Sequence, residues 1–362
     1  MNFDLSDEQK MLADTARSVL AEHSPFDRLR TLIDAKAEWD DELWRALAEM
    51  GFLGAAVPEA HGGLGLSELD LGVVSEALGS ANVAVPFFSS IVLAANAIQL
   101  AGSAEQKAQW LPRLASGQAV ACFAGAEGPG PVIGTKTGLA DGRVSGTKTP
   151  VADAGVADIA IVACDGALAI VRLDQAGVTR QRLDSFDQLR PHYRLTFDRA
   201  EADPLPATID LADLLDRAAV QAAFEAVGGA TTCLTMARDY AMERMIFGRP
   251  LASYQAIKHK LADIAVAIEL ARSNAYYAAW AAAEAPDDLP AAAAAARLTA
   301  LAAFEAAARE NLQVHGGIGY TFEANCHFFY RRERLLAVNV GQRDYWADRL
   351  IAAQPGSQAR AA

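Results

Sequence analysis

The sequence predicts a mostly α-helical protein in which a small antiparallel β domain separates two helical domains. The first hundred or so residues carry two helix-capping boxes. A block that begins near residue 119 carries two Asp-Gly turns between β-branched runs, and the remainder returns to a helical period in long Ala-rich segments. A chain of 362 residues is long enough to bury a large core in two or three domains.

The N-terminal domain, residues 1–117, is expected to be helical. Ser6 and Ser103 each begin a capping box, in which the serine hydroxyl bonds a free backbone N–H and a glutamine three residues later reaches back. Between them, the run ending at Pro58 predicts a helix stop, and the glycines of residues 62–65 predict a flexible loop. Another helix is expected to begin directly after that loop.

The middle domain, residues 118–208, is expected to form a β-barrel-like antiparallel sheet. Asp-Gly pairs at residues 141–142 and 165–166 supply the positive φ angles that tight hairpin turns need. The apolar segments on either side of the second turn are expected to pair with each other. Further strand candidates are residues 120–124 and 194–197.

The C-terminal domain, residues 209–354, is expected to be a four-helix bundle. Long Ala-rich helices joined by short loops favour antiparallel packing, and alanine allows close approach. A flexible tail, residues 355–362, is predicted to follow. The expected helices cover residues 211–245, 254–284 and 290–315, with a last helix after Arg334.

Composition excludes several classes of protein. The net charge of −13 at pH 7 argues against nucleic-acid binding, which needs basic patches. Four scattered cysteines without a C-x-x-C spacing, and six histidines without ligand spacing, predict neither a metal site nor a redox pair. No secretory signal is visible, and the apolar stretches are interrupted by charges, so we expect a cytoplasmic protein without membrane insertion.

Two C-terminal segments tell the most about function. Residues 316–323 (GGIGYTFE) follow a helical run, and residues 243–251 (ERMIFGRPL) precede Gln255. Together they resemble the C-terminal signature of the acyl-CoA dehydrogenase family. Upstream, LSDEQ at residues 5–9 and VPE followed by GGLG at residues 57–65 are similar to that family's N-terminal pattern. The resemblance extends over nearly the whole chain and implies the family's fold.

The resemblance implies α,β-dehydrogenation of an acyl-CoA thioester with FAD as cofactor. In this family a carboxylate in a dry pocket removes the α-proton, and the β-hydrogen leaves as hydride to the flavin. One branch of the family places the base four residues after the third glycine of the turn, which is Glu323 here. A second branch places it on an upstream helix, at a position that falls near Ala218. Asp216 and Glu225 are close to that position but out of register, so Glu323 is the better candidate.

The resemblance also implies the residues that hold FAD. Arg244 and Gln255 are similar to residues that reach the pyrophosphate from a neighbouring subunit, and a guanidinium fork suits phosphate oxygens. Gln313 and Gly317 are similar to positions near the adenine.

Other positions of the signature have less specific roles. Gly316 and Gly317 also form a helix C-cap, which by itself explains the glycines. Phe247 is expected to pack in the core or near the cofactor. Tyr320 and Glu127 are expected on the substrate side.

The sheet domain departs from the family pattern. The usual Thr-Glu-Pro motif with a following Gly-Ser-Asp reads AGAEGPG at residues 124–130, where only Glu127 is retained. Pro150 stands where a Trp would stack on the flavin, and Ala152 where a Thr would bond it. This asymmetry resembles the heteromeric acyl-CoA dehydrogenases that act on bulky acyl-CoAs, including steroid side chains. It predicts a hetero-oligomer with a homologous chain that carries the intact motifs.

Several alternatives stay open. The chain could be a homo-oligomer, or a non-catalytic subunit that completes the FAD site of a partner, which would then supply the base. It could also use oxygen, as an acyl-CoA oxidase or a relative of flavin monooxygenases does, instead of passing electrons to an electron-transferring flavoprotein. A Rossmann site is excluded because the glycines follow a helix instead of opening one after a strand. Acyl chain length and branching are not predicted.

Two remaining groups of residues have ordinary interpretations. His315 and His327 flank the glycine turn and are expected to pack or to join a polar network. Arg331, Arg332 and Arg334 form a basic cluster that is expected to face solvent or to contact phosphates.

Overall fold

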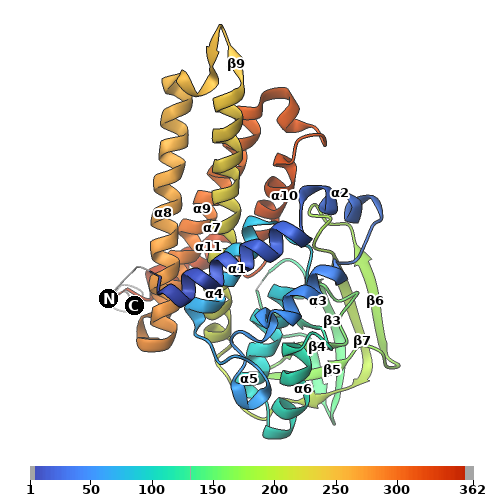
Figure 1. Ribbon diagram of the computed structural model, residues 1–362. Helices are drawn as coiled ribbons and strands as arrows, with labels where there is room; N and C mark the ends of the chain where they lie inside the picture. Colours follow the sequence, from blue (N-terminus) through green and yellow to red (C-terminus); the bar gives the residue numbers. More distant parts are fainter. Residues whose placement is uncertain (1–4, 131, 355–362) are drawn as a thin grey trace. The chain divides into compact units, whose positions relative to one another are not determined.

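The computed structural model describes residues 5–130 and 132–354 (Figure 1). Helices, then β-strands, then helices follow one another along the chain, which confirms the predicted fold class. The chain forms two compact units, and each is assembled from separate stretches. One unit, here the bundle unit, comprises Met1–Phe26, Glu68–Asn82 and Ala219–Ala362, and the other, the sheet unit, comprises Asp27–Ser67 and Val83–Ala218. The domain boundaries expected after residues 117 and 208 stay predictions.

The sheet unit contains two four-stranded sheets. Their strand orders are β1-β4-β5-β8 and β2-β3-β7-β6. The strand pairs are antiparallel, as expected of this domain, except for β1 and β4, which run parallel. The strands are β1 (Ala121–Ala124), β2 (Gly138–Ala140), β3 (Arg143–Ala152), β4 (Ile159–Cys164), β5 (Ala167–Arg172), β6 (Val178–Leu183), β7 (His192–Glu201) and β8 (Asp203–Pro204).

Both Asp-Gly pairs form the predicted hairpin turns. Asp141 and Gly142 have φ angles of 50° and 66° and connect β2 to β3. The second turn connects β4 to β5, with φ of 73° at Gly166. Positive φ angles match the twist of the paired strands, which is why Asp-Gly favours these turns.

The helices of the sheet unit cover an apolar core beside the first sheet. Trp110 and Leu111 pack in one buried cluster with Ile159 and Ile161 of β4. The predicted capping box at Ser103 is present, with reciprocal bonds of 2.9 and 3.2 Å to Gln106. The longer helices are α2 (Phe26–Asp34), α3 (Asp41–Glu49), a π-helix (Phe88–Ala95), α5 (Asn96–Ala101) and α6 (Ala104–Ala115).

The bundle unit consists of long helices, and the predicted capping box at Ser6 opens its first one. Helix α4 crosses α7 so closely that a Cβ at Gly228 would clash with the carbonyl oxygen of Glu76. Such small residues allow the Ala-rich helices to pack at short range. The helices are α1 (Asp7–His23), α4 (Glu68–Ser80), α7 (Leu211–Glu243, of which this unit holds the part from residue 219), α8 (Gln255–Glu284), α9 (Leu289–His315), α10 (Cys326–Leu336) and α11 (Arg343–Ala352).

The bundle unit differs from the expectation in two places. Helix α7 ends at Glu243 because a short hairpin follows, formed by β9 (Met245–Ile246) and β10 (Arg249–Pro250), with positive φ at Phe247 and Gly248. This hairpin is the upper tip in Figure 1. Helix α10 was not predicted, and its N-cap residue Asn325 makes no side-chain capping bond.

Helix α9 is a core helix. By length and composition alone, the helical stretch Pro286–Tyr320 would be sufficient to span a membrane, but 61% of its most apolar window is buried inside the protein. It also carries Arg297, whose side chain is fully buried. Alanine, not isoleucine or leucine, dominates its sequence, as close helix packing requires.

Candidate functional site

The glycine turn directly follows α9. Gly316 has φ of 65°, in the left-handed region that favours glycine, and it ends the helix. A Cβ at Gly319 would lie 2.5 Å from the carbonyl oxygen of Leu312, so this position has no room for a larger residue. A Cβ at Gly317 would meet nothing within 4 Å, which leaves the backbone there open to a ligand. The turn is therefore tightly packed on one side and open on the other.

Glu323 lies on the loop between this turn and α10. Its backbone N–H donates to the hydroxyl of Thr321 (3.3 Å), and that hydroxyl donates to the carbonyl oxygen of Ile318 (2.8 Å). These bonds order the backbone at the base predicted from the sequence. The side chain itself is exposed, so the single chain does not provide the dry pocket that the expected chemistry needs.

Aromatic and cationic side chains flank Glu323. Phe322 is 62% exposed, yet its ring is contacted by the edge of His327 (centroids 5.0 Å apart) and by the guanidinium of Arg331 (5.1 Å). Tyr320 is 66% exposed and donates to Gln313 (3.3 Å). The loop thus presents a carboxylate directly after two exposed aromatic residues whose side chains contact neighbouring residues.

The hairpin at the other end of the signature presents Arg244 and Phe247. Phe247 is 95% exposed at the hairpin turn. The hairpin is held by Tyr254, which donates to the carbonyl oxygen of Ile246 (3.0 Å). Arg244 is exposed, and among the residues that the structure describes its guanidinium makes no ion pair. A guanidinium in this state is available for a phosphate.

One apolar cluster brings the predicted cofactor residues to the same end of the bundle. Ala241 near the end of α7, Ile257 near the start of α8 and Val314 near the end of α9 belong to it. Arg244 follows α7, Gln255 begins α8, and Gln313 precedes Val314, so segments some seventy residues apart converge. All three of these polar side chains are exposed. The donor set of one guanidinium, two amides and an open glycine backbone fits the diphosphate and adenine of a dinucleotide.

Glu127 has a different environment in the sheet unit. Its carboxylate accepts bonds from the fully buried Lys148 (2.9 Å), from the Thr137 hydroxyl (2.7 Å) and from the backbone N–H groups of Lys136 and Thr137. Burial alone would raise the pKa of Glu127, but these bonds outweigh it and hold the pKa at about 2. The geometry favours a structural role for Glu127 over the predicted substrate contact.

The two residues of the sheet unit that replace the family's Trp and Thr lie on one face of β3. Pro150 is exposed and Ala152 half-buried, and they alternate with the buried Val151, so both point away from the core. Neither side chain offers an aromatic face or a hydroxyl. The residues present in this segment therefore do not fit a flavin ring in the way that the bundle residues fit the dinucleotide.

The structure corrects the prediction for the basic cluster after the glycine turn. Arg332 is buried and forms an ion pair with Glu225 of α7 (3.1 Å), while Arg334 pairs with Glu305 (3.0 Å). Arg332 is therefore neither a solvated residue nor a phosphate contact. A signal was present in the sequence: Phe328 and Leu336, four residues before and after Arg332, share the buried face of α10.

The two histidines beside the turn pack as expected. His315 stacks on Tyr240 of α7, and His327 contacts the rings of Phe322 and Phe328. Within the described part of the chain, no group of three or more His, Cys, Asp or Glu side chains is arranged to hold a metal ion.

Comparisons with known proteins agree with these features. Residues 6–118 match the family model described as the acyl-CoA dehydrogenase N-terminal domain, and residues 211–354 match that of the C-terminal domain. The chain is 32% identical to acyl-CoA dehydrogenase IpdE2 of Mycobacterium tuberculosis over 327 residues, which cover 90% of this chain and 91% of that protein.

Solved structures give the same picture. A chain of the ChsE4-ChsE5 complex from Mycobacterium tuberculosis superposes with a TM-score of 0.90 at 28% identity, covering 98% of this chain and all of that one. A chain of the Tcur3481-Tcur3483 steroid ACAD superposes with a TM-score of 0.90 at 29% identity, covering 98% of this chain and 99% of that one.

Proposed function

This chain belongs to the acyl-CoA dehydrogenase family of FAD-dependent oxidoreductases, and from that premise we propose that it removes the α-proton of an acyl-CoA thioester through Glu323. The observation that carries the proposal is the ordered loop that holds Glu323 four residues after Gly319. FAD, when bound, accepts the β-hydrogen as hydride and so completes the enoyl-CoA.

Glu323 acts in this proposal as a general base. It must be ionised before the reaction and must lie in a dry site when the thioester is bound, because water would compete for its carboxylate. In the single chain Glu323 is exposed, directly after the exposed Phe322. Substrate and a neighbouring subunit are expected to cover this loop and to exclude water from it.

The end of the bundle that carries Arg244, Gln255 and Gln313 is proposed to hold the diphosphate and adenine of FAD. These side chains are exposed and converge through one apolar cluster. Arg244 provides a positive charge for the phosphates, and Gly317 leaves room for close approach to the backbone. Phe247, exposed at the hairpin tip, is proposed to be covered by the same neighbouring subunit.

The neighbouring subunit is proposed to be a homologous chain with an intact flavin-facing sheet. Pro150 and Ala152 offer no stacking face and no hydroxyl, so a second chain is needed to hold the flavin ring. Two of the similar structures are named for pairs of chains, and one of them is called a steroid ACAD. We extend both features to this protein and propose a hetero-oligomer that acts on bulky acyl-CoAs such as those of steroid side chains. The complex is further proposed to lie in the cytoplasm and to pass its electrons to an electron-transferring flavoprotein.

The test is to express the chain alone and together with a homologous chain that carries the Trp and Thr motifs. We expect stoichiometric yellow FAD only in the co-purified complex, and bleaching of its flavin absorbance when a bulky acyl-CoA is added. Glu323→Gln should abolish bleaching without loss of FAD. A matched control is Glu284→Gln, at an exposed carboxylate that ends α8, which should bleach normally.

One observation favours a second function. Because Glu323 is exposed in the single chain and the sheet motifs are lost, the chain would serve equally well as an FAD-completing subunit whose partner supplies the base. Unchanged turnover of Glu323→Gln in the assembled complex would select this alternative. If the protein is an acyl-CoA oxidase, oxygen should reoxidise the reduced flavin at least as fast as electron-transferring flavoprotein does.

A further inference from the structure

We propose that the buried ion pair between Arg332 and Glu225 positions the loop that carries Glu323, which makes both positioning residues for the reaction proposed above. The inference rests on that proposed function for its catalytic meaning. The structural part of it, that the pair determines where the loop lies, is independent of which residue is the base.

The pair joins α10 to α7 inside the bundle unit. Arg332 Nη1 lies 3.1 Å from Glu225 Oε1, and the two side chains are only 1% and 7% exposed. Two charges removed from water are stable only if they keep good hydrogen-bonding geometry with each other. A rotation or slide of α10 on α7 would break that geometry, so the pair defines one register between these helices.

A second buried guanidinium holds the far end of the same helix. Arg297 of α9 is fully buried, and its Nη2 donates to the carbonyl oxygen of Leu336, the last residue of α10, and to Asn339 (2.8 Å). Burial lowers the pKa of Arg297 to about 10, so it still carries its charge at neutral pH. Helix α10 is thus tied to α7 at its middle and to α9 at its end.

The loop spans the ten residues 316–325, between the last residue of α9 and the first of α10. Glu323 lies three residues before Cys326, where α10 begins. One end of the loop is held by the stack of His315 on Tyr240, and the other moves with α10. The position of Glu323 therefore follows the position of α10, which the ion pair determines.

This arrangement assigns a role to two groups that the proposed reaction does not use. Glu225 lies near the position where a second branch of the family places its base, but its carboxylate is bonded to a buried guanidinium and is not available to a substrate. Arg332 belongs to the basic cluster, but it points inward. An apolar contact between α7 and α10 would hold them together as well, but it would allow them to slide.

The experiment uses the assembled holoenzyme. The double variant E225L/R332M replaces both charges by apolar side chains, so neither member of the pair is left as a buried charge without the other. The matched control, E76L/R272M, removes another ion pair of the bundle unit, between α4 and α8, whose partners lie 3.1 Å apart. For each variant, kcat, KM and FAD content are measured, together with amide hydrogen exchange of residues 316–325.

We expect E225L/R332M to retain FAD, to show faster exchange in residues 316–325, and to lose about 10- to 100-fold in kcat with KM changed by no more than about twofold. The control should change neither kcat nor exchange in this loop. Unchanged kcat and unchanged exchange in E225L/R332M would overturn the proposal. If that variant does not assemble, Arg332→Lys is used instead, because it keeps the positive charge but loses the planar guanidinium. It should show a smaller loss of kcat and a smaller increase in exchange of residues 316–325. Wild-type values of both would overturn the proposal.

The failure of the proposed function gives a different pattern. If Glu323→Gln turns over like the wild type while E225L/R332M exchanges faster in residues 316–325, the loop is positioned by the pair but Glu323 is not the base. If Glu323→Gln is inactive and E225L/R332M is normal in both respects, the base is correct and the positioning role is wrong.

Discussion

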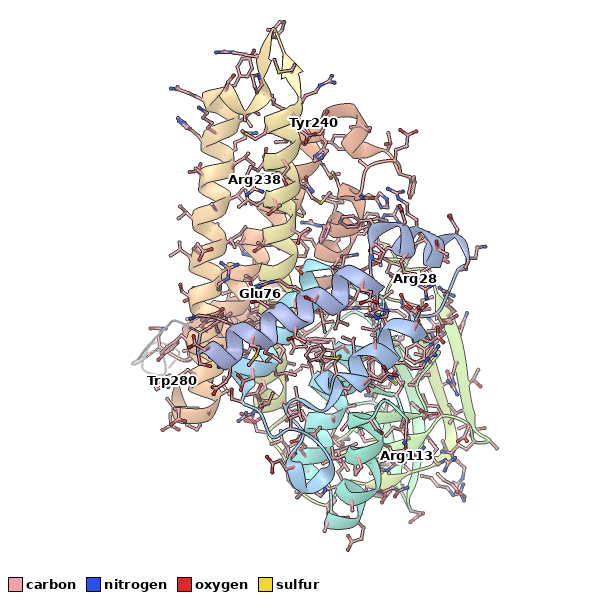
Figure 2. All side chains as sticks on the ribbon, viewed as in Figure 1. Arg28, Glu76, Arg113, Arg238, Tyr240 and Trp280 are labelled. Atoms are coloured by element: carbon pink, nitrogen blue, oxygen red, sulfur yellow. The ribbon has the colours of Figure 1, made fainter. Side chains whose placement is uncertain are left out.

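Tyr240 of α7 stacks on His315, the last residue of α9, with ring centroids 4.3 Å apart and planes inclined by 27°. The pair connects two helices whose ends carry the candidate cofactor residues, since Arg244 follows α7 four residues after Tyr240 and the glycine turn follows His315 directly. Figure 2 marks Tyr240 in the upper part of the bundle, below the hairpin tip. The stack therefore holds the end of α7, which leads into the hairpin, against the end of α9, which leads into the glycine turn.

Replacing Tyr240 by Leu should weaken this end of the bundle. The loss of an aromatic pair is expected to cost about 0.5–1.5 kcal/mol of unfolding free energy and to speed the release of FAD. Urea unfolding and FAD release kinetics in the assembled complex measure the two effects. Tyr277→Leu, at the opposite end of α8 where Tyr277 bonds Asp288, should lower stability without changing FAD release. Equal FAD release in both variants would contradict the prediction.

Gly319→Ala should disturb the turn, whereas Gly317→Ala should not. A Cβ at residue 319 meets the carbonyl oxygen of Leu312 and the side chain of His315, so the turn must shift, at a cost of about 1–3 kcal/mol. A Cβ at residue 317 meets nothing within 4 Å, and thermal denaturation should be that of the wild type. If the backbone at Gly317 approaches FAD as proposed, this variant should nevertheless bind FAD more weakly. Equal stability of the two variants would show that the turn is not tightly packed.

Arg244→Leu should lower the affinity for FAD and leave the fold intact. Arg244 is exposed and makes no ion pair among the described residues, so its removal exposes no buried partner. A lost hydrogen bond to a charged phosphate corresponds to about 1.5–3 kcal/mol, or about 10- to 100-fold in Kd. Fluorescence titration of the deflavinated complex measures it. The control is Arg238→Leu, labelled in Figure 2, which breaks only an exposed pair with Asp239.

The sheet unit should lose stability in acid through Glu127. Hydrogen bonds to the folded carboxylate lower its pKa from an ordinary value of 4.5 to about 2, so the unfolded state binds a proton at a higher pH than the folded state does. This contribution to stability is complete above about pH 4.5 and is lost as the pH falls toward about 2. Unfolding free energies of Glu127→Gln should therefore fall less steeply than those of the wild type over this range.

A control for this pH dependence is Glu201→Gln, which alters an exposed carboxylate of the same unit that pairs with Arg143. It should retain the wild-type slope in acid. If the unfolding free energies of the wild type and of Glu127→Gln fall with the same slope in acid, the folded protein does not lower the pKa of Glu127 and the prediction is wrong.

Local signals in the sequence were sufficient for the capped helix starts and the Asp-Gly hairpin turns. The serine and glutamine of each capping box lie three residues apart, and the Asp-Gly pairs adopt their turn angles from their own backbone preferences. The spacing of Glu323 from the third glycine is likewise local. These interactions join residues fewer than five apart, and so they can be read without knowing the fold.

The partners of buried charges were not predictable in this way. Glu225 and Arg332 lie 107 residues apart, and Glu127 and Lys148 lie on different segments of the sheet unit. Arg332 was misassigned to the surface because a charged residue is rarely buried without a partner, and its partner is far away in the sequence.

By itself, the sequence determined the succession of a helical, a β and a second helical region, the two capping boxes, the Asp-Gly hairpin turns and the family, because each depends on short-range patterns. Only the tertiary structure decided which charges are buried, that Arg332 holds Glu225, and that Glu323 is exposed in the single chain. Burial and pairing depend on which distant segments meet, and the free energy of a charge depends on those neighbours more than on its own residue type.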